Sequence, residues 1–177
     1  GITVTMVPGP SAVIAGLVLS GLPSGRFAFE GFLPVNKRVR TERLQAIKDD
    51  TRTLVFYEAP HKLIHTLGDL RSVFGNRRIA LARELTKKFE EISRLTLDEA
   101  IEKYEKEAPR GEFVLVLEGA DRRTLEEEKA EGWKEISLEE HVKKYTDSGM
   151  DRKEALKKVA ADRGISRRDV YNGLLEH

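Results

Sequence analysis

Short runs of strand-forming residues alternate with helix-forming segments over the first 120 residues of this 177-residue chain. Apolar and β-branched residues fill the strand-like runs, and the segments between them space apolar residues as an amphipathic helix does. This alternation favours an α/β domain. We expect strands at 2–7, 27–33, 53–57, 78–83, 89–95 and 113–117, and helices at 12–19, 37–48, 60–74 and 97–107.

The strand pattern stops after residue 120. Residues 121–136 are dominated by charge and indicate an acidic linker or a solvated helix. Helices are expected at 137–146, 152–163 and 166–174, and the turn Gly164-Ile165-Ser166 resembles that of a helix-turn-helix hairpin. A small helical packing domain is the alternative. The expected organisation is thus a domain at 1–120, an acidic linker at 121–136 and a helical domain at 137–177, ending in a tag remnant.

Residues 1–25 carry no charged side chain. Glycines and prolines interrupt this stretch, so it is neither a membrane span nor a signal peptide, and we expect a buried strand, a turn and a buried helix. The chain also has no cysteine, which excludes disulfides, thiolate metal sites and cysteine nucleophiles. Both features lead us to expect a cytoplasmic protein without a membrane partner.

Charge is distributed unevenly although the net charge is only +1. Residues 26–94 hold 15 basic and 9 acidic side chains, whereas residues 95–140 hold 7 basic and 15 acidic ones. A basic segment of this kind suits an anion-binding face, and an ordinary solvated surface is the alternative.

Three turns carry the residues best suited to chemistry. The turn at 7–11 follows a strand and opens a helix, where backbone N–H groups face a ligand. The turn at 57–61 lies at a strand end, the usual ligand side of an α/β sheet, although Glu58 there also suits a cap for the helix at Pro60. The charged turn at 83–87 ends a third strand, and a salt-bridged hairpin loop is its alternative reading.

No metal site is expected, because the four histidines do not cluster and nothing indicates carboxylate partners for His61 and His65. The sequence also lacks a P-loop, a GxSxG motif and a GxGxxG motif. Residue patterns alone therefore reach an α/β ligand-binding domain with a small helical appendage.

Five motifs read in order carry a resemblance to a known family. They are VPGPSA at 7–12, EGFLP at 30–34, VFYEAPHKL at 55–63, ARELTK at 82–87 with FEE at 89–91, and GEFV at 111–114. This series resembles the ribosomal RNA small subunit methyltransferase I group of the tetrapyrrole methylase superfamily. The resemblance covers nearly the whole chain but only the later part of the family's protein. One departure is Leu95, where the family pattern usually has glycine.

The resemblance implies the C-terminal domain of a class III methyltransferase, with a mixed sheet flanked by helices and a small three-helix unit. It implies S-adenosylmethionine as cofactor, a homodimer, and methyl transfer to the ribose 2′-hydroxyl of a cytidine in the decoding region of 16S rRNA in the small ribosomal subunit. Because the family's N-terminal domain is missing, we expect this chain alone to bind the cofactor weakly and to be inactive.

The same resemblance assigns roles to individual residues. A cation and a carboxylate near the 2′-hydroxyl favour the developing alkoxide and accept its proton, and basic side chains hold the phosphates on either side. Apart from the resemblance, Arg167 and Arg168 at the turn between the terminal helices are expected to add a weaker contact with RNA or the ribosome. The expected cofactor-binding residues are Pro8, Gly9, Pro10, Ser11, Tyr57 and Glu58; the catalytic ones are Arg83, Glu84 and Lys87; the RNA-binding ones are Lys37, Arg38, Arg40 and Arg43.

Two other functions stay open at this point. One is a methylase of the same superfamily acting on a tetrapyrrole or another small molecule, which the ARELTK motif and the basic helix at 37–48 argue against. The other is a non-enzymatic nucleic-acid-binding module built on residues 137–177.

Overall fold

A five-stranded mixed sheet forms the centre of the first part of the chain. The structure is a computed structural model that describes residues 9–175, so the strand expected at 2–7 lies outside the described residues. The strand order is β1-β2-β5-β3-β4. Strands β1 and β2 pair in parallel and the other three pairs are antiparallel. The bounds are β1 Phe27–Phe32, β2 Thr53–Glu58, β3 Arg78–Arg83, β4 Glu91–Thr96 and β5 Phe113–Leu117.

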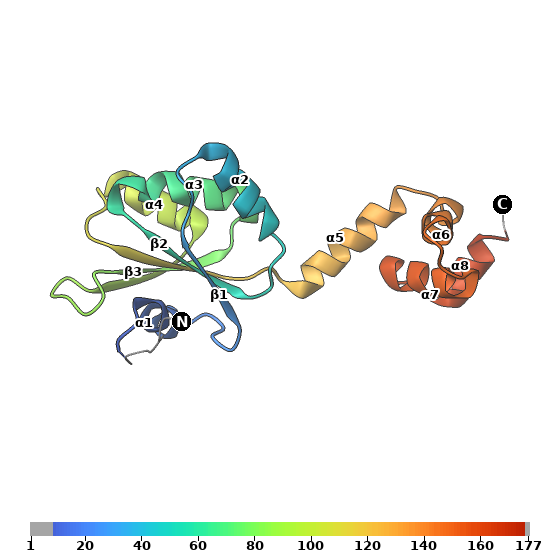
Figure 1. The fold of residues 1–177 in the computed structure, drawn as a ribbon, viewed down its shortest axis with the longest axis horizontal. Helices are drawn as coiled ribbons and strands as arrows, with labels where there is room; N and C mark the ends of the chain where they lie inside the picture. Colours follow the sequence, from blue (N-terminus) through green and yellow to red (C-terminus); the bar gives the residue numbers. More distant parts are fainter. Residues whose placement is uncertain (1–8, 176–177) are drawn as a thin grey trace, which may run out of the picture. The chain divides into compact units, whose positions relative to one another are not determined.

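Helices cover both faces of this sheet (Figure 1). On one face lie α2 (Lys37–Ala46), α3 (Leu63–Phe74), which follows the short 3₁₀ turn η1 (Pro60–Lys62), and α4 (Leu97–Lys106). On the opposite face α1 (Ala12–Ser20) packs against β3, β4 and β5. The mixed sheet flanked by helices agrees with the expected fold class.

The two faces of the sheet belong to two separate apolar cores. Leu54 and Phe56 of β2 face the larger core under α2, α3 and α4, whereas Val55 between them faces the smaller core under α1. This division follows from the alternation of side chains along a strand. Gly16 brings α1 close to β5, because a Cβ on it would lie 2.8 Å from Val114 Cγ1.

A second compact unit begins at Asp121. The segment for which a linker or a solvated helix was expected is helix α5, and Trp133 at its end stacks on His141 with ring centroids 3.8 Å apart. Ser137 and Ser166 start two of the helices with capping boxes, as their positions before Glu140 and Asp169 favour. The helices are α5 (Arg122–Lys134), α6 (Leu138–Asp147), α7 (Arg152–Arg163) and α8 (Arg167–Gly173).

Small apolar residues form the core of this unit. Ala155 and Val159 of α7 and Val170 of α8 are fully buried together. Gly164 ends α7 in the left-handed conformation, with φ +63°, and the three-residue turn then leads into α8. Within residues 9–175, no helix is long and apolar enough to cross a membrane.

Candidate functional site: a cavity at the ends of three strands

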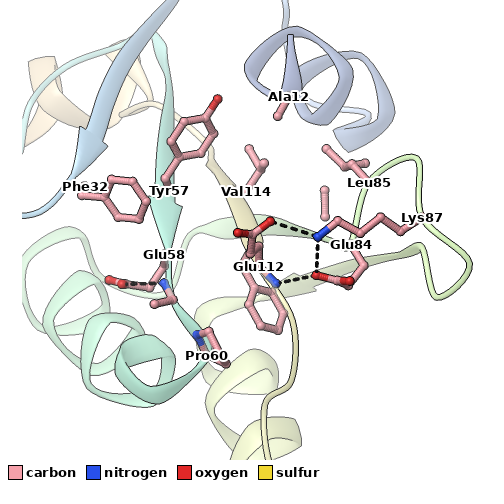
Figure 2. Close-up of a pocket in the computed structure, with 13 residues that line it drawn as sticks. Ala12, Phe32, Tyr57, Glu58, Pro60, Glu84, Leu85, Lys87, Glu112 and Val114 are labelled. Atoms are coloured by element: carbon pink, nitrogen blue, oxygen red, sulfur yellow. Dashed lines mark hydrogen bonds and ion pairs between the residues drawn. The ribbon is translucent and has the colours of Figure 1, made fainter. Parts of the chain in front are cut away.

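The sheet brings the ends of three strands to one edge. Strands β1, β2 and β3 run in the same direction, and antiparallel β5 begins where they end, so Phe113 pairs with both Glu58 and Arg83. A cavity of about 490 Å³ opens at this edge (Figure 2). It is lined by Ala12, Phe32, Tyr57, Glu58, Ala59, Pro60, Ala82, Glu84, Leu85, Lys87, Glu112, Phe113 and Val114.

Aromatic rings form one wall of the cavity. The Tyr57 ring lies 5.6 Å from that of Phe32 and 5.0 Å from that of Phe29, measured between centroids. Phe32 is 65% exposed. The two rings lining the cavity, Phe32 and Tyr57, offer flat apolar surface to a planar group.

Charged side chains form the opposite wall (Figure 2). Lys87 Nζ lies 3.1 Å from Glu84 Oε1 and 3.0 Å from Glu112 Oε2, and Glu84 Oε1 also accepts the Glu112 N–H at 2.9 Å. The Glu112 N–H and then Lys87 lower the pKa of the Glu84 carboxyl, and Glu112 and Glu84 raise the pKa of the Lys87 amine. Glu84 is therefore ionised and Lys87 protonated at neutral pH. This cluster agrees with the salt-bridged loop that was the alternative interpretation of the turn at 83–87.

The backbone around this cluster adopts left-handed conformations. Glu84 and Thr86 have φ +50° and +65°, and Gly111 has φ +79°. A Cβ on Gly111 would lie 2.5 Å from Glu84 Cγ, so only glycine leaves room for the Glu84 side chain. The Thr86 N–H donates to Glu90 Oε2 at 2.6 Å and ties the loop to itself.

Glu58 lines the cavity but its carboxylate turns away toward α3. Oε1 accepts the Ala59 N–H at 2.8 Å and Oε2 accepts the Thr66 hydroxyl at 2.5 Å. The residue is only 4% exposed. Both oxygens thus have protein donors, which is close to the capping role named as the alternative and leaves neither oxygen turned toward a ligand in the cavity.

Arg83 is absent from the residues that line the cavity. Alternation along β3 turns Ala82 toward the cavity and Arg83 to the other face of the sheet. There its Nη2 lies 3.3 Å from Glu91 Oε2, and Lys103 of α4 bonds the other oxygen of Glu91. The catalytic role expected for Arg83 is therefore not supported by its position, whereas Glu84 and Lys87 do line the cavity.

The described residues of the first expected turn, 9–11, lie next to the cavity without lining it. Pro8 lies outside the described residues, and Gly9, Pro10 and Ser11 are exposed without lining the cavity. Ala12, the first residue of α1, lines it. The turn therefore lies at the cavity's border.

The four basic residues of α2 separate into two groups. Lys37 and Arg38 are exposed, the latter at 84% of its side chain, and Arg43 is half exposed beside Glu30. Arg40 is only 7% exposed and donates hydrogen bonds to Asp69 and Thr66. The RNA contact expected of Arg40 is therefore not supported by its position.

The sequence did not single out every residue that the site uses. Phe32 and Glu112 stand inside the EGFLP and GEFV motifs but received no role, and Thr66 carried no signal because its partners come from other elements. Among the described residues, no three His, Asp or Glu side chains are grouped so that they could hold a metal ion.

Comparison with known proteins defines the class. The family model described as Tetrapyrrole (Corrin/Porphyrin) Methylases matches residues 1–101, so the chain belongs to this family. A solved structure described as the methyltransferase CobJ shares the fold, with a TM-score of 0.50 and 23% identity over 64% of this chain and 49% of that chain. The expected α/β fold of this family is thereby confirmed.

More similar relatives carry a more specific name. The chain is 43% identical over 172 residues to ribosomal RNA small subunit methyltransferase I of Halalkalibacterium halodurans, covering 97% of this chain and 59% of that protein. It is 41% identical over 169 residues to the Bacillus subtilis protein of the same name, covering 96% of this chain and 58% of that protein. The chain thus spans less than two thirds of the length of these relatives.

Proposed function

We propose that this chain is part of an S-adenosylmethionine-dependent methyltransferase that modifies the ribose 2′-hydroxyl of a cytidine in 16S rRNA of the small ribosomal subunit. One observation carries the proposal: a cavity with an aromatic wall facing a charged cluster, in a chain that matches ribosomal RNA small subunit methyltransferase I along 97% of its length. We place its action in the cytoplasm, where the substrate lies.

The residues of the cavity fit the proposed cofactor. Its volume of about 490 Å³ falls in the range of small-molecule sites, roughly 300–1,000 Å³. Phe32 and Tyr57 supply apolar surface for the adenine ring of S-adenosylmethionine. The carboxylates of Glu84 and Glu112 suit the ribose hydroxyls and the cationic groups of the same cofactor. When bound, S-adenosylmethionine supplies an electrophilic methyl group on a sulfonium.

The charged wall has the chemistry that the 2′-hydroxyl requires. Methyl transfer is an in-line displacement, so the protein acts mainly by positioning the attacking oxygen. Protonated Lys87 stabilises the negative charge that develops on this oxygen. Glu84, already accepting two hydrogen bonds, orients Lys87. The Glu112 carboxylate, 83% exposed, accepts the proton and passes it to water.

Lys87 is the catalytic residue that a matched pair of variants tests most cleanly. Lys87→Met removes the cation, whereas Lys88→Met removes a neighbouring charge from an exposed residue that does not line the cavity. We expect the first to lower methyl transfer by about 10²-fold or more, as loss of an electrostatic catalytic group does, and the second to leave it unchanged. Equal rates in the two variants would contradict the assignment.

The exposed basic residues of α2 supply the RNA contact in this proposal. Lys37 and Arg38 are available to phosphates, and Arg43 is partly so. Replacing Lys37 and Arg38 with methionine should weaken binding to 16S rRNA fragments and reduce its salt dependence. An unchanged salt slope would remove α2 from the RNA interface.

A homodimer forms part of the same proposal. Ile14 and Val18 of α1 and Phe29 of β1 are 48%, 68% and 49% exposed, and apolar surface of this kind supports contact with another chain. Val18→Asp should convert a dimer to a monomer in sedimentation. A monomeric wild-type protein would contradict the homodimer.

Labelled S-adenosylmethionine separates the proposal from its alternatives. The complete product of the gene that encodes this chain is incubated with 30S subunits or with a precorrin, and we expect label in 16S rRNA. Label only in the precorrin would support the small-molecule alternative. RNA binding that disappears on deletion of residues 121–177, without any methyl transfer, would support the binding-module alternative.

The weak cofactor binding expected of the chain alone stays a prediction, and micromolar binding in calorimetry would contradict it.

A further inference from the structure

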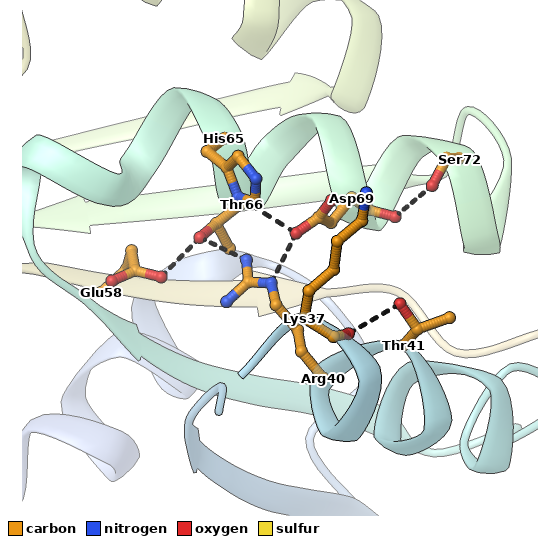
Figure 3. Close-up of polar contacts among 8 residues, drawn as sticks. All are labelled: Lys37, Arg40, Thr41, Glu58, His65, Thr66, Asp69 and Ser72. Carbon is orange, nitrogen blue, oxygen red and sulfur yellow. Dashed lines mark hydrogen bonds and ion pairs between the residues drawn. The ribbon is translucent and has the colours of Figure 1, made fainter. Parts of the chain in front are cut away.

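A buried arginine, Arg40, is linked through Thr66 to Glu58, one of the residues that line the cavity (Figure 3). Arg40 of α2 is 7% exposed; its Nη2 donates to Thr66 Oγ1 at 2.8 Å and its Nε donates to Asp69 Oδ2. His65 Nδ1 lies 3.2 Å from the same Asp69 oxygen. Arg40 is thus fixed to two side chains of α3.

Thr66 passes this contact on to Glu58. Its hydroxyl donates to Glu58 Oε2 at 2.5 Å, while Glu58 Oε1 accepts the Ala59 N–H at 2.8 Å. A hydroxyl has one proton to donate, so Thr66 accepts from Arg40 and donates to Glu58. The hydrogen bonds therefore have one fixed direction, from Arg40 through Thr66 to Glu58.

All three residues of this hydrogen-bond network, Arg40, Thr66 and Glu58, are buried. Thr66 is 1% and Glu58 4% exposed, and buried polar groups cost free energy unless they are hydrogen-bonded. Burying charges is expensive, and apolar residues of similar size often stabilise a fold equally well. The network is therefore better suited to fixing one geometry than to adding stability.

We infer that Arg40 is a positioning residue that acts through Thr66 and Glu58 on the cofactor cavity. Glu58 begins the stretch Glu58-Ala59-Pro60, all of which lines the cavity. Thr66 holds Oε2 of its carboxylate, and Oε1 accepts the Ala59 N–H, so the network is joined to the backbone of this stretch. Without the hydrogen bonds from Arg40 through Thr66 to Glu58, the cavity wall formed by residues 58–60 loses its fixed position. The inference deepens the proposed function, because it assumes that the cavity holds S-adenosylmethionine.

The inference also gives the two sides of α2 different tasks. Lys37 and Arg38 face solvent, where the proposal places RNA, whereas Arg40 faces α3. Variants on the two sides should therefore separate: one side changes RNA affinity and the other changes cofactor affinity.

Thr66→Val is the most direct variant, since it removes the hydroxyl and keeps the side-chain shape. Thr66→Ser restores the hydroxyl, and Arg40→Met removes the donor. Ser72→Ala is the matched control: its hydroxyl also bonds within α3, to the Asp69 carbonyl at 2.8 Å, but does not contact Glu58. Calorimetry with S-adenosylmethionine on the complete gene product gives the dissociation constant of each.

We expect Thr66→Val and Arg40→Met to weaken cofactor binding about tenfold, the effect of losing one buried hydrogen bond. Thr66→Ser and Ser72→Ala should bind as the wild type does. Affinity for a 16S rRNA fragment should stay unchanged in all four and fall in Arg38→Met. A role in stability alone would lower the unfolding midpoint of Thr66→Val without changing its dissociation constant.

A folded Thr66→Val protein that binds the cofactor as tightly as the wild type would overturn the inference. A wild-type protein that binds S-adenosylmethionine but labels no rRNA would overturn the proposed rRNA substrate and leave the inference standing. A wild-type protein that binds no S-adenosylmethionine would overturn both.

Discussion

Gly111→Ala tests how the charged wall of the cavity is built. The backbone there has φ +79°, and a Cβ would lie 2.5 Å from Glu84 Cγ and 2.7 Å from its Oε1. The substitution therefore adds two separate penalties: a left-handed backbone for a residue with a Cβ, and a collision with Glu84. Relieving the collision moves Glu84 from the Glu112 N–H and from Lys87.

The backbone penalty can be measured by itself. Gly21 has φ +74°, and a Cβ on it would meet Arg94 Nε at 3.5 Å, an ordinary contact. Gly21→Ala should therefore lower the free energy of unfolding by roughly 1–2 kcal/mol, the cost of the left-handed conformation. Gly111→Ala should lower it by more than this, because the collision is added.

A double-mutant cycle isolates the collision. Urea unfolding is measured for the wild type, Gly111→Ala, Glu84→Ala and the double variant, since contacting residues couple and distant ones do not. In the Glu84→Ala background the penalty at 111 should fall to that of Gly21→Ala. An equal penalty at 111 in both backgrounds would refute the packing of Glu84 over Gly111.

Three further substitutions test the core and the electrostatics. Leu115→Ala, at a fully buried position of β5, should lower the free energy of unfolding by about 2–5 kcal/mol in urea titrations; a loss below 1 kcal/mol would contradict its burial. The hydrogen bond from Arg78 lowers the pKa of Glu118 below its usual 4.5, so Arg78→Met should raise that pKa in NMR titrations. Because the lowered pKa belongs to the folded state, the stability difference between the two proteins should be present above pH 4.5 and shrink as the pH falls below it; a difference that does not change with pH would argue against the pair. Burial lowers the pKa of His141, and Trp133 covers its ring, so Trp133→Ala should raise that pKa; an unchanged value would mean that other residues bury it.

Most of the sheet could be predicted from the sequence because the strands are apolar runs bounded by breakers. The expected strands at 78–83 and 113–117 agree with β3 and β5 as observed. The strand expected at 89–95 begins later, at Glu91, because residues 84–90 form a loop with two left-handed residues. The strand order could not be predicted, since it depends on pairings between residues far apart in the chain.

The site was predicted less completely, because side-chain direction depends on neighbouring elements. The buried stripe of α2 and its end is Arg40, Leu44 and Ile47, a helical spacing that the sequence did contain. From the sequence alone, a charged residue at such a position is predicted to be solvent-exposed, because the partner that allows its burial is not visible there. The partners of Arg40 and Glu58 lie on α3, so neither role could be read from the local sequence.

Nucleoside mass spectrometry of 16S rRNA tests the central proposal most directly. The rRNA is isolated from cells of the source organism that lack the gene, and from the same cells carrying the wild-type gene or the Lys87→Met variant. The proposal predicts that one 2′-O-methylcytidine in the decoding region disappears on deletion, returns with the wild type and fails to return with the variant. A full complement of 2′-O-methylcytidine in the deletion strain would contradict it.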